Sequence, residues 1–130
     1  MRLFLGTDIC EIERISSIYS RYKEKFLHKT FSEAEIKYCL SEPKHTVSRL
    51  AVRFATKEAV SKALGVGINS LGWSKGINCK DVELVRNPEG SVELRLYNKA
   101  KELEVELGIT GWTVSVSHDR HSAVSTVIGY

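Results

Sequence analysis

Glu58 and Lys62 are the first side chains in this sequence whose placement calls for a chemical explanation. They lie four residues apart in the segment RFATKEAVSKALG, residues 53–65. On a helical wheel at about 100° per residue, both point to the side that carries the apolar residues Val47, Ala51, Phe54 and Ala55. A Glu–Lys pair at this spacing stabilises a helix by only about 0.2–0.5 kcal/mol, whereas removing either charge from water costs several kcal/mol. The pattern therefore indicates either a wet cleft or subunit boundary, or a site that needs a carboxylate and an ammonium group together.

Asp8 is a second carboxylate that a plain surface position does not explain. Residues 2–10, RLFLGTDIC, alternate so that Leu3, Leu5, Thr7 and Ile9 share one face of a predicted strand, and Asp8 lies on the other face near the strand end. Magnesium commonly takes only one or two protein carboxylates and completes its shell with water and phosphate oxygens. Asp8 and Glu58 are thus candidates to share such an ion, although acid pairs are common in any chain of this length.

Lys62 beside such an ion would supply a fixed positive charge for a phosphate or a departing oxyanion. The alternative is a lysine whose stem packs on the helix while its ammonium group stays in water. His118, in VSVSHDRH at residues 114–121, stands at a predicted strand end, where a histidine can bind phosphate, move a proton, or simply belong to the turn. Ser115 and Ser117 lie on the opposite strand face, so a serine–histidine nucleophile pair is geometrically unfavourable.

Three helices must position these groups in the first half of the chain. Periodicity and capping residues predict them over residues 11–26, 32–42 and 46–64. The second opens with a capping box of Ser32 and Glu35, and Gly65 provides the left-handed cap of the third. On the third helix, Arg49, Arg53 and Thr56 lie opposite the apolar side and are expected to face solvent.

The second half of the chain predicts strands joined by tight turns. The glycine-rich segment 65–79 has no steady period and is predicted to be a long loop. Strands are predicted over residues 80–85, 91–97, 112–118 and 122–130, with a short helix around residues 100–107. The turns NPEG at 87–90 and DRH at 119–121 make two hairpins. We therefore expect a single α+β domain over residues 1–130, with an antiparallel sheet of about five strands and helices packed on one side.

Composition limits the classes of protein that fit. At 130 residues and 42% hydrophobic content, the chain is able to bury a core. The net charge of +3 favours anionic partners, which include nucleic acid, phosphate cofactors and acidic proteins. Neither a membrane span nor a leader segment is visible, so a soluble cytoplasmic protein is expected. The cysteines Cys10, Cys39 and Cys79 are widely spaced and form no CxxC pair, so neither a disulfide framework nor a zinc site is predicted.

The predicted helix 11–26 carries a basic outer face. Arg14, Arg21, Lys23 and Lys25 surround its apolar stripe. This face is either solvated or a docking strip for an acidic partner. Its aromatic residues are not interleaved with the charges on one face, as stacking on single-stranded nucleic acid would require, so nucleic acid is the less favoured partner.

Three segments of the chain together resemble a known enzyme family. They are GTDICEIERI at residues 6–15, RFATKEAVSKALG at 53–65 and VSVSHD at 114–119. In this order and spacing they are similar to the holo-acyl-carrier-protein synthase family, the short type of 4'-phosphopantetheinyl transferase. The likeness covers almost the whole chain, and its central KEAxxKALG block is highly specific.

The resemblance implies a reaction and a set of site residues. Members of the family transfer the phosphopantetheine arm of coenzyme A to a serine of apo acyl carrier protein and require magnesium. By resemblance, Asp8 and Glu58 are the magnesium ligands, Lys62 neutralises the coenzyme A diphosphate, and Arg53, Gly65 and His118 contact coenzyme A phosphates. The resemblance leaves the base that deprotonates the serine open, among Glu58, a water on the metal, and His118.

The resemblance also implies partners and an assembly. Arg14 and Arg21 match the helix that receives the acidic recognition helix of the carrier protein. Similar proteins are trimers with active sites between neighbouring subunits, act in the cytoplasm and support fatty acid biosynthesis. The carrier itself stays open, because a carrier from a polyketide or peptide assembly line would use the same chemistry. The rival hypothesis is a basic binding module whose helix 11–26 contacts RNA or an acidic protein without any chemistry.

The chain departs from the family pattern at three places. Thr56 replaces a small alanine that is common before the KEA run, the loop 69–79 looks longer than usual, and NPEGSV lacks the lysine and proline that often follow its glycine. These departures concern loop contacts to adenine or carrier rather than the reaction.

Overall fold

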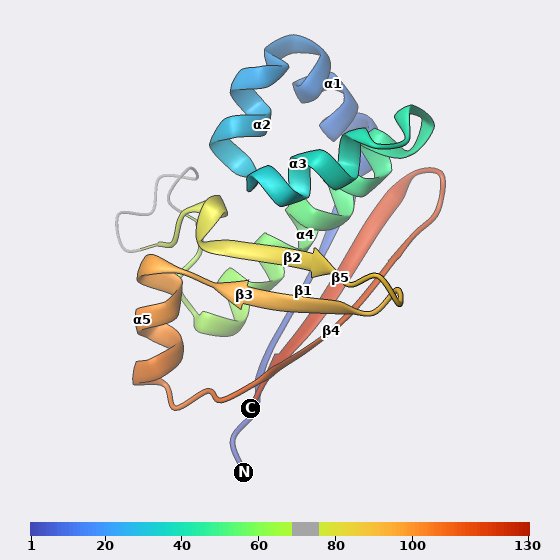
Figure 1. Cartoon of the computed structure of the whole chain (residues 1–130). Coiled ribbons are helices and arrows are strands. Elements are labelled where there is room, and N and C mark those ends of the chain that lie inside the picture. The colour runs from blue at the N-terminus through green and yellow to red at the C-terminus, as the bar shows by residue number, and fades with distance from the viewer. Residues whose placement is uncertain (69–75) are drawn as a thin grey trace.

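Helices and strands follow the predicted order in the computed structural model, which describes residues 1–68 and 76–130 (Figure 1). The described helices are α1 (Ile12–Tyr22), α2 (Glu24–Thr30), α3 (Glu33–Leu40), α4 (Thr46–Leu64) and α5 (Asn98–Glu106). The strands are β1 (Phe4–Glu11), β2 (Val82–Arg86), β3 (Val92–Leu96), β4 (Trp112–His118) and β5 (Ser122–Gly129). Short 3-10 turns, η1 (Pro43–His45) and η3 (Cys79–Asp81), precede α4 and β2. The α+β class is confirmed.

The described strands are all antiparallel and are divided between two sheets. One sheet has the order β1-β5-β4, and β2 pairs only with β3. In the first sheet, Ser125 of the central strand pairs with Asp8 on one side and with Val116 on the other. Because neighbouring strands are about 4.8 Å apart, the strands that carry Asp8 and His118 are separated by about 10 Å. The expectation of one sheet of about five strands is therefore wrong, because local sequence patterns identify each strand but not which strands share a sheet.

Helix α4 is the central element of the fold. It packs against β1 and β5 on one side and against α3 and β2 on another (Figure 1). The approach to β1 is so close that a Cβ atom at Gly6 would overlap the carbonyl oxygen of Ala59. The helix ends as predicted at Gly65, whose φ of 75° is left-handed and whose N–H donates to the Lys62 carbonyl at 3.1 Å. The third predicted helix is thereby confirmed at both ends.

Strand β1 turns its more apolar face away from the core. Phe4, Gly6 and Cys10 are buried against α4, whereas Leu3, Leu5 and Ile9 are 56%, 63% and 68% exposed. The alternation in residues 2–10 therefore identifies the strand and its Asp8 side correctly. Within the part of the chain that the structure describes, the helices cover only one face of the β1-β5-β4 sheet, and the other face exposes the aliphatic side chains of Leu5, Ile9 and Val124.

The predicted helix 11–26 is two helices. The chain breaks between α1 and α2 at Lys23, whose φ of 44° lies in the left-handed region that favours glycine. The Lys23 N–H donates to the Tyr19 carbonyl at 2.8 Å, which closes α1. The apolar stripe continues across the break, and lysine is not a turn residue, so periodicity alone predicts one helix.

The predicted loop 65–79 lies partly outside the described residues. At its two ends, Ile68 and Ile77 form a bridge and are both buried in the core. The interpretation of residues 69–75 as part of an unusually long loop falls outside the part of the chain that the structure describes.

Candidate functional site

Asp8 and Lys62 form an ion pair at the boundary between β1 and α4. The Lys62 Nζ lies 2.9 Å from Asp8 Oδ1 and also donates to the Thr7 carbonyl at 3.0 Å. The Lys62 side chain is 54% exposed and that of Asp8 is 16% exposed, so Lys62 is far more open to solvent than its inward position on the wheel predicts. The two groups remain accessible to a ligand.

Glu58 completes an acidic and basic cluster on the same side of α4. Burial raises the pKa of Glu58 above its ordinary value, the Asp8 carboxylate raises it further, and Lys62 and Arg14 oppose the shift. Burial raises the pKa of Cys10 to about 11, with Arg14 lowering it and Asp8 and Glu58 raising it. Asp8, Glu58, Lys62 and Arg14 therefore act on one another, and we call these four residues the acidic half-site.

The donor set of the acidic half-site suits magnesium. Asp8 and Glu58 contribute carboxylate oxygens, and the residues described by the structure contain no group of three or more histidine, cysteine or acidic side chains able to enclose a metal. A hard cation that needs few protein oxygens and takes the rest from water and phosphate matches this sparse set. Burial and, to a smaller extent, the Asp8 carboxylate raise the pKa of Glu58, and a bound cation would oppose both effects.

Arg53 and His118 lie on the other side of α4. Arg53 and Glu58 are five residues apart, which is about 140° around the helix, and His118 is on the edge strand opposite Asp8. Both line a cavity of about 270 Å³ to which Arg49, Arg86 and His45 also contribute. The residues predicted to bind one ligand are therefore split in this chain, and we call Arg53, His118, Arg49, Arg86 and His45 the basic half-site.

The expectation that Arg53 and Thr56 face solvent is wrong. Arg53 is 4% exposed and Thr56 is fully buried. The Thr56 hydroxyl contacts the Val52 carbonyl at 2.8 Å and the Ser125 hydroxyl at 2.9 Å, which joins α4 to β5. The wheel assumed one covered side, but α4 is covered by the sheet on one side and by α3 and β2 on another. Arg49, which is half-buried, is closer to the expectation.

Gly65 and the two arginines of α1 are the remaining predicted residues. Gly65 is exposed at the end of α4, three residues beyond Lys62. Arg14 and Arg21 are both exposed on α1, and the Arg21 guanidinium lies over the Tyr22 ring, 5.4 Å from its centroid. Arg14 thus links α1 to the cluster of Asp8 and Glu58, and Arg21 lies two turns further along the same helix.

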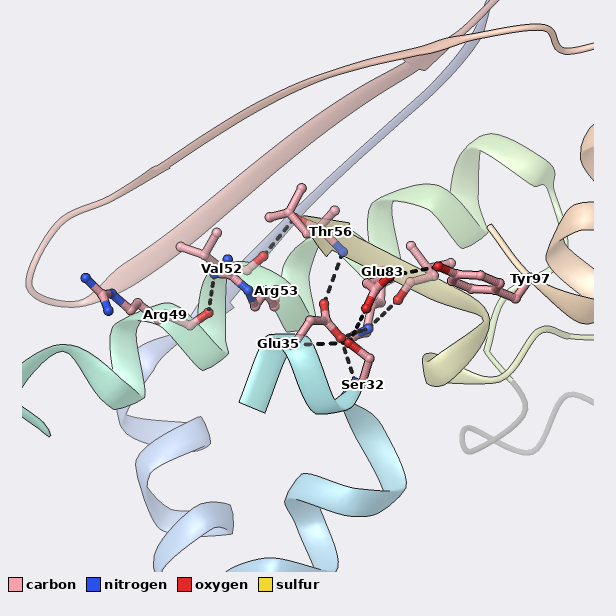
Figure 2. A network of polar contacts seen from close by, with 11 residues as sticks. Ser32, Glu35, Arg49, Val52, Arg53, Thr56, Glu83 and Tyr97 are labelled. Carbon is pink, nitrogen blue, oxygen red and sulfur yellow. Dashed lines mark hydrogen bonds and ion pairs between the residues drawn. The ribbon is translucent and has the colours of Figure 1, made fainter. Parts of the chain in front are cut away.

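A buried polar network, which the sequence reasoning missed, holds α4 from the other side. Lys57 and Glu35 form an ion pair at 2.8 Å with both side chains 1% exposed. Glu35 also accepts from the N–H groups of Ser32 and Leu84, and Lys57 donates to the Val82 carbonyl. Figure 2 shows how Glu83 extends the network by accepting from the Ser32 and Tyr97 hydroxyls. The capping box of Ser32 and Glu35, which was predicted, was the signal that pointed toward it.

No helix in the described ranges is long and apolar enough to cross a membrane.

Comparisons with known proteins show the family and the fold of this chain. The family model described as the 4'-phosphopantetheinyl transferase superfamily matches residues 4–124. A holo-acyl-carrier-protein synthase of Gloeobacter violaceus is 42% identical over 123 residues, covering 95% of this chain and 89% of that protein. The corresponding protein of Chlorobaculum parvum is 43% identical over 125 residues, covering 95% of both chains. Among solved structures, the Helicobacter pylori holo-acyl-carrier-protein synthase in complex with coenzyme A matches with a TM-score of 0.80 and 33% identity, covering 97% of this chain and 99% of that chain.

Proposed function

The chain belongs to the 4'-phosphopantetheinyl transferase superfamily, and we propose that it transfers the 4'-phosphopantetheine group of coenzyme A to a serine of apo acyl carrier protein, releasing adenosine 3',5'-bisphosphate. The observation that carries this proposal is the cluster of Asp8, Glu58 and Lys62, in a chain more than 40% identical to two holo-acyl-carrier-protein synthases over 95% of its length. The whole of residues 1–130 then forms one transferase domain.

The reaction is an in-line displacement at the phosphorus atom next to pantetheine. The serine oxygen forms a bond to this β-phosphorus, and the bond from phosphorus to the bridging oxygen of the diphosphate breaks, so that both electrons leave with adenosine 3',5'-bisphosphate. A magnesium ion held by Asp8 and Glu58 supplies neutralising charge on the diphosphate oxygens when bound. Lys62 offers N–H donors and positive charge to the same oxygens, which matters most as the bridging oxygen becomes anionic.

The serine proton needs an acceptor, and Glu58 is the protein group in the acidic half-site best suited to it. Of the two carboxylates in this cluster, Asp8 is already paired with Lys62 at 2.9 Å, which leaves Glu58 as the one more available to accept a proton. His118 is the competing base, and it lies on the opposite edge strand of the same subunit. The pH dependence of the rate for His118→Ala separates them: an unchanged profile removes the histidine, and loss of one titration favours it.

We extend the proposal to a trimer in which active sites form between subunits. Two features support it: the uncovered face of the β1-β5-β4 sheet exposes Leu3, Leu5 and Ile9, and the acidic and basic half-sites of one chain face apart. Joining the acidic half-site of one subunit to the basic half-site of a neighbour would bring all predicted coenzyme A contacts together. Light scattering should give the mass of three chains, and Leu5→Asp should give monomers without activity. A monomeric wild type would contradict this extension.

The carrier and the setting complete the proposal. Arg14 and Arg21, exposed on α1 next to the acidic half-site, are placed to receive an acidic helix of the carrier. A carrier of fatty acid biosynthesis in the cytoplasm is the expected partner. Replacing Arg21 by glutamate should raise the KM for carrier without changing that for coenzyme A, because Arg21, unlike Arg14, is not part of the acidic half-site.

The experiment that tests the activity is a mass measurement on the carrier. The protein is incubated with apo acyl carrier protein, coenzyme A and magnesium, and the carrier should gain one phosphopantetheine group. Omitting magnesium, or changing the acceptor serine to alanine, should abolish the gain. Running the assay across fatty acid, polyketide and peptide carriers identifies the preferred one, and no gain with any carrier would refute the proposal.

A further inference from the structure

The basic half-site is organised around one aromatic ring. Tyr38 of α3 lies among three guanidinium groups, whose Cζ atoms are 4.2 Å (Arg49), 4.5 Å (Arg53) and 5.9 Å (Arg86) from the ring centroid. Tyr38 and the three arginines all line the cavity of about 270 Å³. Like charges gathered on one ring repel one another, so the arrangement needs a compensating group.

The arginines differ in how far their charge is compensated within the chain. Arg49 pairs with Glu42 at 3.0 Å and donates to the Tyr38 carbonyl and the Ser41 hydroxyl. No carboxylate in the described ranges lies within ion-pair distance of Arg53 or Arg86. The Arg49 charge is therefore compensated within the chain, and the charges of Arg53 and Arg86 remain available to an anionic ligand.

Arg53 is the more unusual of the two available arginines. Its side chain is 4% exposed, its only hydrogen bond among the described residues is a 3.4 Å contact from Nη1 to the Arg49 carbonyl, and its buried Nε has no partner (Figure 2). A buried cation with so few hydrogen bonds is unfavourable unless an anion completes it. The Tyr38 ring, whose centroid lies 4.5 Å from the Arg53 Cζ, is the group that offers this cation a cation–π interaction.

An aromatic ring is suited to this task in a way that a carboxylate is not. It attracts the flat face of a guanidinium group without using the N–H donors at its edge. Those donors stay free for a two-pronged interaction with a phosphate. A carboxylate in place of Tyr38 would neutralise Arg53 and occupy the same donors.

We propose that Tyr38 is a positioning residue, whose ring fixes the Arg53 guanidinium so that its N–H edge meets a phosphate monoester of the donor substrate in this cavity. The inference rests on the proposed function for the identity of that donor, coenzyme A. Tyr38 touches no reacting atom, and it acts through Arg53.

The test compares Tyr38→Leu with Tyr38→Phe in steady-state kinetics with coenzyme A as the varied substrate. Tyr38→Leu should raise the KM for coenzyme A about 10-fold with kcat within about 2-fold of wild type, since the reacting centre is untouched. Tyr38→Phe keeps the ring and should behave as wild type. Tyr130→Leu removes an exposed tyrosine ring that does not line the cavity and is the matched control, with no change in KM.

A second donor separates positioning from a general structural effect. Dephospho-coenzyme A lacks the ribose phosphate but keeps the reacting diphosphate. Tyr38→Leu should reduce the preference of the enzyme for coenzyme A over dephospho-coenzyme A about 10-fold, because only the former presents a phosphate monoester. Equal losses for both donors, or an unchanged KM, would overturn the proposal.

Direct binding keeps the inference testable if Tyr38→Leu is poorly folded. Tyr38→Met fills a similar volume without a ring, and calorimetry with adenosine 3',5'-bisphosphate measures the site without turnover. Weaker binding to Tyr38→Met than to Tyr38→Phe supports the proposal, and equal binding refutes it. If the wild type binds this nucleotide but modifies no carrier, the proposed function fails while the role of Tyr38 at the phosphate still stands.

Discussion

Helix α4 carries two lysine–carboxylate pairs of nearly identical length and opposite character. Lys57 and Glu35 lie 2.8 Å apart with both side chains 1% exposed, whereas Lys62 and Asp8 lie 2.9 Å apart with the lysine 54% exposed. In the first pair every partner is internal, since Glu35 also accepts two backbone N–H groups. In the second pair, donors and lone pairs remain open to solvent. The distance between the charges therefore does not distinguish a structural pair from a functional one. The number of donors and acceptors in the pair that have no partner within the chain does distinguish them.

The largest effect on stability is expected at the internal pair. Lys57→Met leaves Glu35 buried without its counter-ion and should lower the free energy of unfolding by about 3–5 kcal/mol. The double variant Lys57→Met with Glu35→Gln removes both charges while keeping an acceptor for a backbone N–H, and should recover at least half of the loss. Urea unfolding measures both. A single variant as stable as wild type would mean that the pair does not hold α4.

Lys62→Met should show the reverse pattern. An exposed ion pair contributes about 0–1 kcal/mol, so the free energy of unfolding should change by no more than that. The loss of positive charge at the diphosphate should lower kcat by about 10²–10³-fold. Lys62→Arg, which keeps the charge but not the shape, is the matched control and should retain more activity. If Lys62→Met unfolded as readily as Lys57→Met, the contrast between the pairs would be lost.

Glu58→Gln tests whether the open pair belongs to a metal-binding cluster. Removing this carboxylate should lower the rate by at least about 100-fold, in line with the loss of one key electrostatic group. Glu106→Gln, at the exposed end of α5, is a control for the same chemical change and should leave the rate unaltered. A near-normal rate for Glu58→Gln at saturating magnesium would contradict the role of Glu58.

The smallest effect is a pH dependence of stability measured without magnesium. Burial and Asp8 raise the pKa of Glu58 above its ordinary 4.5, against the opposing influence of Lys62 and Arg14. Just above pH 4.5 the folded state therefore binds more protons than the unfolded state. The contribution of Glu58 to the free energy of unfolding is fully present at lower pH, and it is lost as the pH rises through the pKa of Glu58 in the folded state. Urea unfolding of wild type should show this fall relative to Glu58→Gln. If the free energy of unfolding varied with pH in the same way for both proteins, the raised pKa of Glu58 would be contradicted.

Residue patterns predicted the helices and strands of this fold better than they predicted the burial and the partners of its charged side chains. The capping box at Ser32 and the cap at Gly65 are local signals, and both are confirmed. Arg53 was misplaced because a wheel cannot show that α4 is covered on more than one side. Lys57 was overlooked because a lysine is buried only when a partner from a distant segment satisfies it, and the sequence does not reveal that partner. Arg53 and Glu58 are separated because the two half-sites lie on different sides of the same helix, α4.

Which residues belong together in the candidate site was likewise only partly predictable. Asp8, Glu58 and Lys62 were grouped by spacing and by resemblance, and the structure brings them together. His118 was grouped with them by resemblance alone, and it lies on the opposite edge strand. Strand order depends on long-range pairing, which alternation within a single strand does not encode.

The lack of a Cβ atom at Gly6 affects how substitutions at this position should be interpreted. Because β1 meets α4 at that point with no room for one more carbon atom, the residue two positions before Asp8 governs how near the first strand lies to the helix that bears Glu58. A methyl group there would push the two segments apart and spread the acids. In a mutational scan that measures activity, substitutions at Gly6 should therefore be about as harmful as substitutions at Asp8 and Glu58, although glycine has no functional group that could contact a substrate.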